Sequence, residues 1–373
     1  MRRIQDALPP SVVLLLLLFC LPGCGAGGEP EPGRDGSSDS PPAGVPVPQA
    51  MEASVPKAVQ PLPEFSQVAV GAEVLATLPV GRNPQQIAFS PDGATAYVAA
   101  GRSDRVTILD AKNFLVSGSM DAPGIPVGVG VLPVSGDVLV SVFKEGAVVR
   151  LDRTTGKPIG LLKTGAGSSM LAGPFLGEKF LVAAERDKRI YLFDGATMKV
   201  LASFPTAERP FPPAVTSDGK LGFVASFMDG TVTVIDLERL MLRTLFRVGR
   251  GPSGLAVLPG DEKLAVALWE ENRVAIIDIK ERREVQNLQD GIGLQPLSVV
   301  VAPDGRLAFV NNRMSNDISV IRLPELSVVE RVKVGDIPSA MAVHPSGETL
   351  WVSCEGDHQL YVLAIPSRWT DDD

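Results

Sequence analysis

The side chains of this sequence that could take part in catalysis are few. Its 373 residues include two histidines, His344 and His358, and three cysteines, of which only Cys354 lies beyond residue 24. Zinc and haem sites draw on histidine and cysteine ligands, and no metalloprotease helix, nucleophile elbow or phosphate-binding loop occurs. The sequence therefore indicates no metal and no cofactor, leaves any catalytic residue unknown, and favours a non-enzymatic role.

Charged side chains could instead bind a ligand. Two sets of loop positions, defined by the repeat described next, hold seven arginines and lysines against five acids, although the formal net charge of the chain is −8. An anionic ligand is one interpretation of this excess, and a solvated polar rim is the other. The candidate binding face consists of Arg82, Arg102, Lys144, Arg186, Arg209, Arg250, Trp269, Asn312, Arg313 and His358.

A repeat of about 42 residues must position these loops. Its clearest column consists of Val98, Val140, Val182, Val224, Val266, Val310 and Val352. Five of the six gaps are 42 residues and one is 44. Prolines stand fourteen residues before six of these valines, and Ser168 holds the seventh place. A period of this length indicates one supersecondary unit used seven times.

Each unit contains four short strands and no helix. The unit that follows Pro252 predicts strands at about Ser253–Leu258, Lys263–Trp269, Arg273–Ile279 and Glu284–Leu288, with turns rich in Gly, Pro and Asp between them. The sequence therefore predicts an all-β fold, a seven-bladed β-propeller of four-stranded antiparallel blades. The strand after each proline is expected to be innermost.

The last unit has only three strands before the sequence ends. The missing strand precedes the first unit, because residues 73–81 match residues 242–249. An N-terminal strand is thus expected to complete the last blade and remove both free sheet edges. Five aspartates that end third strands are expected to accept backbone N–H bonds in the next turn; they are Asp110, Asp152, Asp194, Asp236 and Asp278.

The same strand order assigns the loops to two faces. The loops that lead into the prolines and the turns between second and third strands are expected to share one face at the mouth of the central channel, where a rigid scaffold would present a binding site. The two extra residues of the 44-residue gap fall near residues 290–295, on that face. His344 is expected on the opposite face, and Cys354 is expected to be a buried, inert thiol.

The N-terminal segment predicts export. Arg2 and Arg3 precede an apolar run of about ten residues, which is too short to span a bilayer. The sequence Leu21-Pro22-Gly23-Cys24 behind it resembles a bacterial lipobox, which implies lipidation of Cys24 and attachment to the cell envelope, with the outer membrane of a Gram-negative bacterium as the expected site. The expected domains are a signal peptide (1–23), a disordered tether (24–62), the propeller (63–366) and an acidic tail (367–373).

The repeat resembles that of the YVTN-type β-propellers, which are related to lactonase-like and surface-layer propellers. Val232-Thr233-Val234-Ile235-Asp236, Tyr97-Val98 and Ser90-Pro91-Asp92-Gly93 carry this resemblance, although the full tetrad does not occur. The resemblance makes a lactonase-like hydrolase the alternative function.

A binding or scaffold module at the cell envelope is the function that the sequence favours. The expected partners are the membrane, through the lipid anchor, and a protein or a small anionic ligand. Nucleic acid is disfavoured because the chain is acidic overall. Nothing in the sequence indicates an oligomer.

Overall fold

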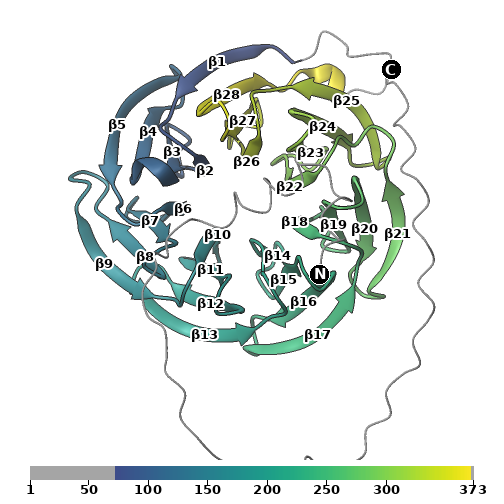
Figure 1. Cartoon of the computed structure of the whole chain (residues 1–373), viewed down its shortest axis with the longest axis horizontal. Coiled ribbons are helices and arrows are strands. Elements are labelled where there is room, and N and C mark those ends of the chain that lie inside the picture. The colour runs from purple at the N-terminus through teal and green to yellow at the C-terminus, as the bar shows by residue number, and fades with distance from the viewer. Residues whose placement is uncertain (1–71, 371–373) are drawn as a thin grey trace, which may run out of the picture. The chain divides into compact units, whose positions relative to one another are not determined.

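The computed structural model describes residues 72–370, and these residues form seven four-stranded antiparallel sheets arranged around a central axis (Figure 1). The predicted signal sequence, Cys24 and the tether lie outside the described residues. Within residues 72–370, no helix is long and apolar enough to cross a membrane. The seven-bladed propeller predicted from the repeat is confirmed.

The first four blades follow the chain without a crossover. Blade 1 contains β2 (Pro84–Phe89), β3 (Thr95–Ala100), β4 (Arg105–Asp110) and β5 (Leu115–Asp121), with η1 (Gly101–Ser103) between β3 and β4. Blade 2 contains β6 (Pro126–Val131), β7 (Val138–Val142), β8 (Ala147–Leu151) and β9 (Pro158–Lys163). Blade 3 contains β10 (Ser168–Phe175), β11 (Lys179–Ala184), β12 (Arg189–Asp194) and β13 (Lys199–Pro205). Blade 4 contains β14 (Ala214–Val215), β15 (Leu221–Ser226), β16 (Thr231–Asp236) and β17 (Met241–Arg247).

The last three blades repeat this order and end in the closure. Blade 5 contains β18 (Pro252–Val257), β19 (Lys263–Leu268), β20 (Arg273–Asp278) and β21 (Arg283–Leu288). Blade 6 contains β22 (Pro296–Val301), β23 (Leu307–Asn312), β24 (Asp317–Arg322) and β25 (Ser327–Lys333). Blade 7 contains β26 (Pro338–Val343), β27 (Thr349–Cys354), β28 (Gln359–Ala364) and, from the start of the described chain, β1 (Val74–Pro79).

The first strand of each blade lies nearest the axis, as predicted (Figure 1). Blade 4 differs in length, because β14 has only two residues and begins four residues after Pro210. Pro212 and Pro213 precede it, and proline has no N–H to give to a sheet ladder. Pro210 itself keeps a single bridge, to Ser226.

The predicted closure of the ring is confirmed. Strand β1 pairs antiparallel with β28, from Val74 opposite Leu363 to Pro79 opposite Gln359. Leu78 and Val80 are buried in a cluster with Trp351 of the last blade. No sheet of the described propeller therefore depends on a neighbouring molecule for its fourth strand.

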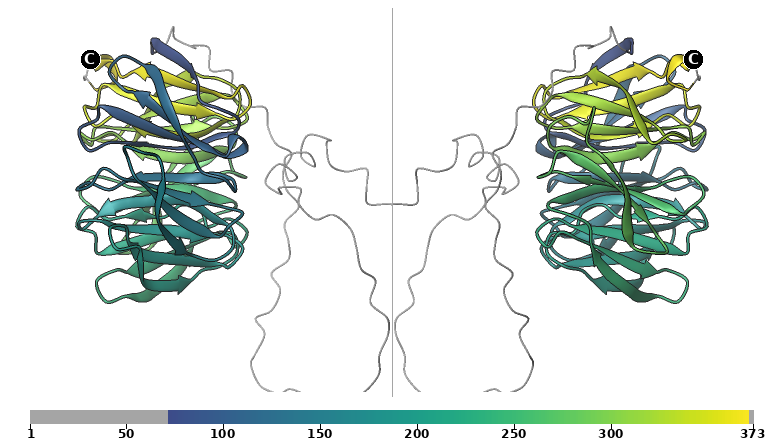
Figure 2. Two further views of the ribbon diagram at one scale, coloured as in Figure 1. Left: turned by 90° about the vertical axis from the view of Figure 1, so that its left-hand side faces the viewer. Right: turned by 90° about the vertical axis from the view of Figure 1, so that its right-hand side faces the viewer.

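Figure 2 shows the blades from the side, and the buried apolar clusters lie between neighbouring blades. One cluster joins Leu132 and Leu139 of blade 2 to Phe180 and Phe193 of blade 3. Small residues on the inner strands leave room for it: a Cβ atom on Gly130 would lie 2.8 Å from the Phe180 ring. Native cores are packed densely enough that such a contact forces a shift.

The third-strand aspartates cap their turns, as predicted. Asp110 accepts the N–H groups of Lys112 (2.9 Å) and Asn113 (3.0 Å), and Asp278 accepts that of Glu281 (2.7 Å). These hydrogen bonds hold the pKa of the Asp110 carboxyl below its ordinary value, the Asn113 side chain contributing most. These carboxylates therefore hold the turns that follow the third strands.

Two further positions follow from the same geometry. His344 lies in the β26–β27 turn, on the face opposite the mouth, with Nε2 2.9 Å from the carbonyl oxygen of Gly93. Cys354 is free and fully buried, and burial raises the pKa of its thiol. The predicted face of His344 and the predicted burial of Cys354 are confirmed.

The folded body extends past residue 366, where the sequence placed its end. Ser367–Trp369 form the 3-10 turn η2, and the Trp369 side chain is 2% exposed against Phe309. Its indole Nε1 donates to the Glu330 carboxylate. An aromatic ring that finds both an apolar contact and a partner for its N–H gains more by packing than by remaining in solvent.

Candidate functional site at the channel mouth

The two predicted loop sets do lie side by side on one face. Each turn between second and third strands is bonded through its backbone to the loop that leads into the same blade: Arg102 N–H donates to the Arg82 carbonyl (3.0 Å), and Trp269 N–H to the Gly251 carbonyl (3.0 Å). Side chains also link neighbouring blades, because Asn272 accepts the Gln295 N–H (2.8 Å) across blades 5 and 6. The mouth is therefore a rigid surface.

One column of the repeat forms this surface. Its members stand three residues after each column valine, where the second strand ends, and we call them the mouth ring: Gly101, Phe143, Glu185, Phe227, Trp269, Arg313 and Glu355. Apart from buried Gly101 and Arg313, their side chains are half-buried. Three of the seven are aromatic, so the ring combines apolar and ionisable groups.

Two arginines lie over two of these rings. The Arg186 guanidinium carbon is 5.1 Å from the centre of the Phe143 ring, and that of Arg209 is 5.2 Å from the centre of the Phe227 ring. Phe227 also stacks with Phe211 (5.7 Å). Cation–π contacts of this kind hold a guanidinium in place while leaving its N–H groups to other partners.

Glu185 stands between Phe143 and Phe227 in the order of the mouth ring. Burial raises the pKa of its carboxyl to about 7, although the positive charges of Arg209 and Arg186 act in the opposite direction. The Glu185 N–H is committed to the Gly167 carbonyl at 3.1 Å. A carboxyl that titrates near neutrality beside two arginines is the most unusual ionisable group of the mouth ring, and such groups mark functional sites.

In the other half of the mouth ring, the charges of Arg313 and Glu355 neutralise each other. Arg313 of blade 6 pairs with Glu355 of blade 7 (2.6 Å), and the second oxygen of Glu355 accepts a hydrogen bond from Gln85 of blade 1 (2.7 Å). A chain of charge-assisted bonds thus joins three blades. Arg313 is 5% exposed, so this chain serves the structure of the mouth more than its surface.

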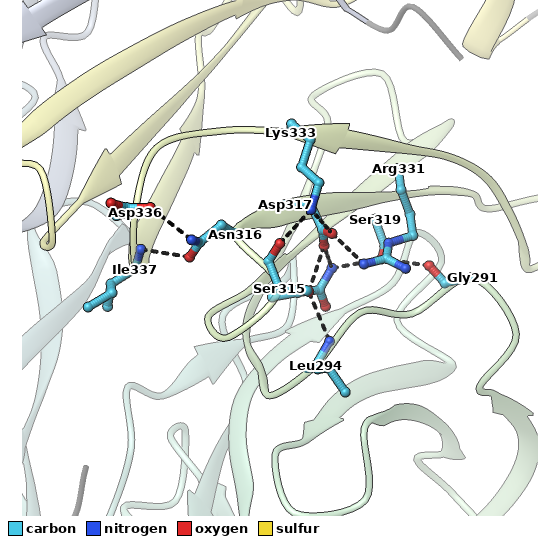
Figure 3. Close-up of polar contacts among 11 residues, drawn as sticks. Gly291, Leu294, Ser315, Asn316, Asp317, Ser319, Arg331, Lys333, Asp336 and Ile337 are labelled. Carbon is cyan, nitrogen blue, oxygen red and sulfur yellow. Dashed lines mark hydrogen bonds and ion pairs between the residues drawn. The ribbon is translucent and has the colours of Figure 1, made fainter. Parts of the chain in front are cut away.

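A second polar cluster supports the longer inter-blade loop of blade 6 (Figure 3). Asp317, 1% exposed, accepts from Asn312 (2.9 Å) and Ser315 (3.0 Å) and pairs with Arg331 and Lys333. Ser315 in turn accepts the Leu294 N–H at 2.9 Å. The cluster anchors residues 290–295, which include the two inserted residues.

The candidate binding face is thus only partly a surface. Arg82, Arg102, Lys144, Arg186 and Arg250 are exposed, and Arg209, Trp269 and His358 are half-buried. Asn312 was expected on the rim, but it is fully buried because its amide donates to Asp317 and Ser319; Arg313 is buried because Glu355 covers it. Phe143 and Phe227 lie under Arg186 and Arg209, and Phe211 stacks on Phe227; the sequence did not single out these three rings. Within residues 72–370, no group of three acidic, histidine or cysteine residues could hold a metal ion.

Comparison with known proteins agrees with this architecture. Residues 266–368 match the lactonase family of seven-bladed β-propellers. A seven-bladed β-propeller protein of Mycobacterium tuberculosis, Rv1057, is 34% identical over 116 residues, which cover 30% of each protein. Protein NirF of Pseudomonas aeruginosa is 24% identical over 301 residues, covering 74% of this chain and 76% of NirF.

Hydrazine synthase of Kuenenia stuttgartiensis has a similar structure. It aligns with a TM-score of 0.68 and 19% identity over 82% of this chain and the whole of the matched chain. At that identity the similarity shows the propeller fold alone. The match to Rv1057 likewise spans less than a third of that protein, so the activity of a relative does not transfer to this chain.

Proposed function

We propose that this protein is a binding module whose mouth ring holds a small anionic ligand with an apolar part. The observation that carries the proposal is the pair Arg186 and Arg209, each stacked on an aromatic ring on either side of Glu185. The guanidinium groups supply charged donors for a carboxylate, sulfate or phosphate. Phe143, Phe227 and Trp269 supply the apolar contacts, as is usual in ligand sites.

Replacing Arg186 and Arg209 together by alanine is the direct test. With phenyl phosphate as the probe, we expect calorimetric affinity to fall at least tenfold, because two charge-assisted contacts of about 1–3 kcal/mol each are lost. The matched control is Arg82→Ala with Arg102→Ala, which removes two exposed arginines of the same face that lie over no aromatic ring among residues 72–370. Equal loss in both double variants, or no binding by the unmodified protein, would reject the proposal.

Hydrolysis of a sugar lactone is the second candidate function. Two observations favour it: the family match over residues 266–368, and the carboxyl of Glu185 with a pKa raised to about 7. Ionised Glu185 could take a proton from water while the water oxygen attacks the lactone carbonyl; the ring C–O bond then breaks, and the proton passes to the alkoxide that leaves. The two arginines would stabilise the oxyanion.

A pH-stat assay with gluconolactone and its 6-phosphate tests this chemistry. If Glu185 is the base, Glu185→Gln should lower the catalysed rate by at least about 100-fold, as for loss of a general base, and the rate of the unmodified protein should rise with pH through about 7. If the unmodified protein does not open the lactone ring faster than the uncatalysed reaction, the hydrolase function is excluded.

A further inference from the structure

The outer strands of blades 3 and 4, β13 and β17, carry exposed apolar and cationic side chains on neighbouring parts of the rim (Figure 1). The Met241 side chain is 51% exposed and that of Leu245 is 50% exposed. Neither strand contains an acidic residue, although the formal net charge of the chain is −8. We define the basic wall as six exposed residues of these strands: Lys199, Leu201, Met241, Arg243, Leu245 and Arg247.

The cations of the basic wall are not neutralised by the propeller itself. In the turn before β17, Arg239 pairs with Asp236 (3.1 Å). Among residues 72–370, by contrast, Lys199, Arg243 and Arg247 have no carboxylate partner. Their charges are therefore directed to solvent, beside apolar side chains that are also exposed. An exposed apolar surface with a charged surround is typical of an interaction site.

The other outer strands lack this combination. The cations of β25, Arg331 and Lys333, pair with Asp317 of the same blade. Strand β21 contains Glu284, and β5 ends in Asp121. Strand β1 has no charged residue, and β9 has a single lysine. The unneutralised cations thus occur together with exposed apolar side chains on one side of the ring.

We propose that the basic wall docks on an anionic lipid surface. Guanidinium groups bind the phosphates of lipid headgroups, and each cation near such a surface adds to the attraction. Leu201, Met241 and Leu245 would enter the boundary between headgroups and acyl chains. A nucleic acid also offers phosphates, but it has no apolar region for these three side chains. Because the chain is acidic overall, an anionic membrane would repel its other sides and select this one.

Vesicle sedimentation of the full-length protein, with Cys24→Ser to prevent lipidation, measures the docking. The unmodified wall should bind vesicles of phosphatidylglycerol and phosphatidylcholine in equal parts, and pure phosphatidylcholine much more weakly. Arg243→Ser with Arg247→Ser should lower affinity for the anionic vesicles about 25-fold, since each cation contributes about fivefold. The matched control is Arg105→Ser with Lys112→Ser, an equal change of charge at exposed positions of blade 1, and it should keep the affinity.

A local reporter separates the wall from the apolar run at residues 12–19, which every variant keeps. Leu245→Trp places an indole on the basic wall, and Thr77→Trp places one on the exposed part of β1 in blade 7. Anionic vesicles with brominated acyl chains should quench the fluorescence of Leu245→Trp more than that of the parent protein. Thr77→Trp should show no additional quenching.

Three outcomes would overturn the proposal. One is equal loss of vesicle binding in the two double serine variants, which would indicate a general effect of charge. Another is equal quenching of the two tryptophan variants. The third is a dimer that Met241→Ser with Leu245→Ser converts to a monomer without loss of vesicle binding, because the wall would then be an interface between two copies. The mouth ring is not involved, so affinity for phenyl phosphate should not change in Arg243→Ser with Arg247→Ser.

Discussion

Deletion of residues 72–80 from the full chain should lower the melting temperature by more than 10 °C and broaden the unfolding transition. The deletion removes all of β1, exposes the edge of β28, and takes Leu78 and Val80 away from Trp351. Burial of two such side chains is worth about 1.5–3 kcal/mol each. The lost ladder adds to this, so the total approaches a large part of the roughly 5–15 kcal/mol of a typical domain.

Calorimetry of the deletion variant would measure this effect, and a peptide with the sequence of residues 72–81 should restore part of the stability when added in excess. The matched control is Leu75→Ser in the intact chain, because Leu75 is an exposed residue of the same strand. An unchanged melting temperature after deletion would show that the ring does not depend on its closing strand.

The fold could be predicted because each of its signals recurs in at least five of the seven blades. Each strand-ending aspartate, inner-strand proline and small inner residue appears several times in register, so one ambiguous position does not matter. The closing strand could be predicted for the same reason: β1 carries the sequence pattern of β17, and only the last repeat unit lacks a fourth strand of its own, which β1 supplies to blade 7. Repetition averages out the tertiary effects that make single segments hard to assign.

The sequence assigned the candidate site to one face of the propeller, but it did not identify the residues at the centre of that site. The mouth ring is a column like the others, three residues after the valines, but no single residue type predominates among its seven members. A search for conserved columns therefore passes over it, and Phe143, Phe227 and Glu185 were not singled out as its central members. The signal that could have identified these residues is a position that recurs in every repeat unit but carries side chains of different chemistry.

The burial of Arg313 could not be predicted from the repeat alone. Asn312 is the last residue of β23 rather than a loop residue, and Arg313 follows it at a position where five of the seven mouth-ring residues are half-buried. Their burial depends on Asp317 and on Glu355, which comes from the next blade. Spacing within one unit fixes a residue's place on its own blade, whereas the neighbour that covers it is set by the packing of two units.

Asp317→Ala should lower the free energy of unfolding by about 3–5 kcal/mol, the usual cost of removing one partner from a buried ion pair. The substitution leaves Arg331 without the carboxylate it binds and the buried Asn312 amide without one of its two acceptors, the other being Ser319. Urea denaturation followed by fluorescence would measure the change. It should be among the most damaging single substitutions of a polar residue in blade 6.

The effect should reach the mouth as well as the core of the blade. A Cβ atom on Gly293 would lie 2.6 Å from an Asp317 carboxylate oxygen, so residues 290–295 pack directly on this cluster. Hydrogen exchange at the Leu294 N–H, which Ser315 now accepts, should therefore accelerate in Asp317→Ala. The control is Asp304→Ala, since Asp304 pairs with Arg306 in an exposed turn of the same blade and such pairs are worth about 0–1 kcal/mol. If both alanine variants lose the same small amount, the buried carboxylate does not organise the loop, and packing of Ile292 and Leu326 alone must hold it.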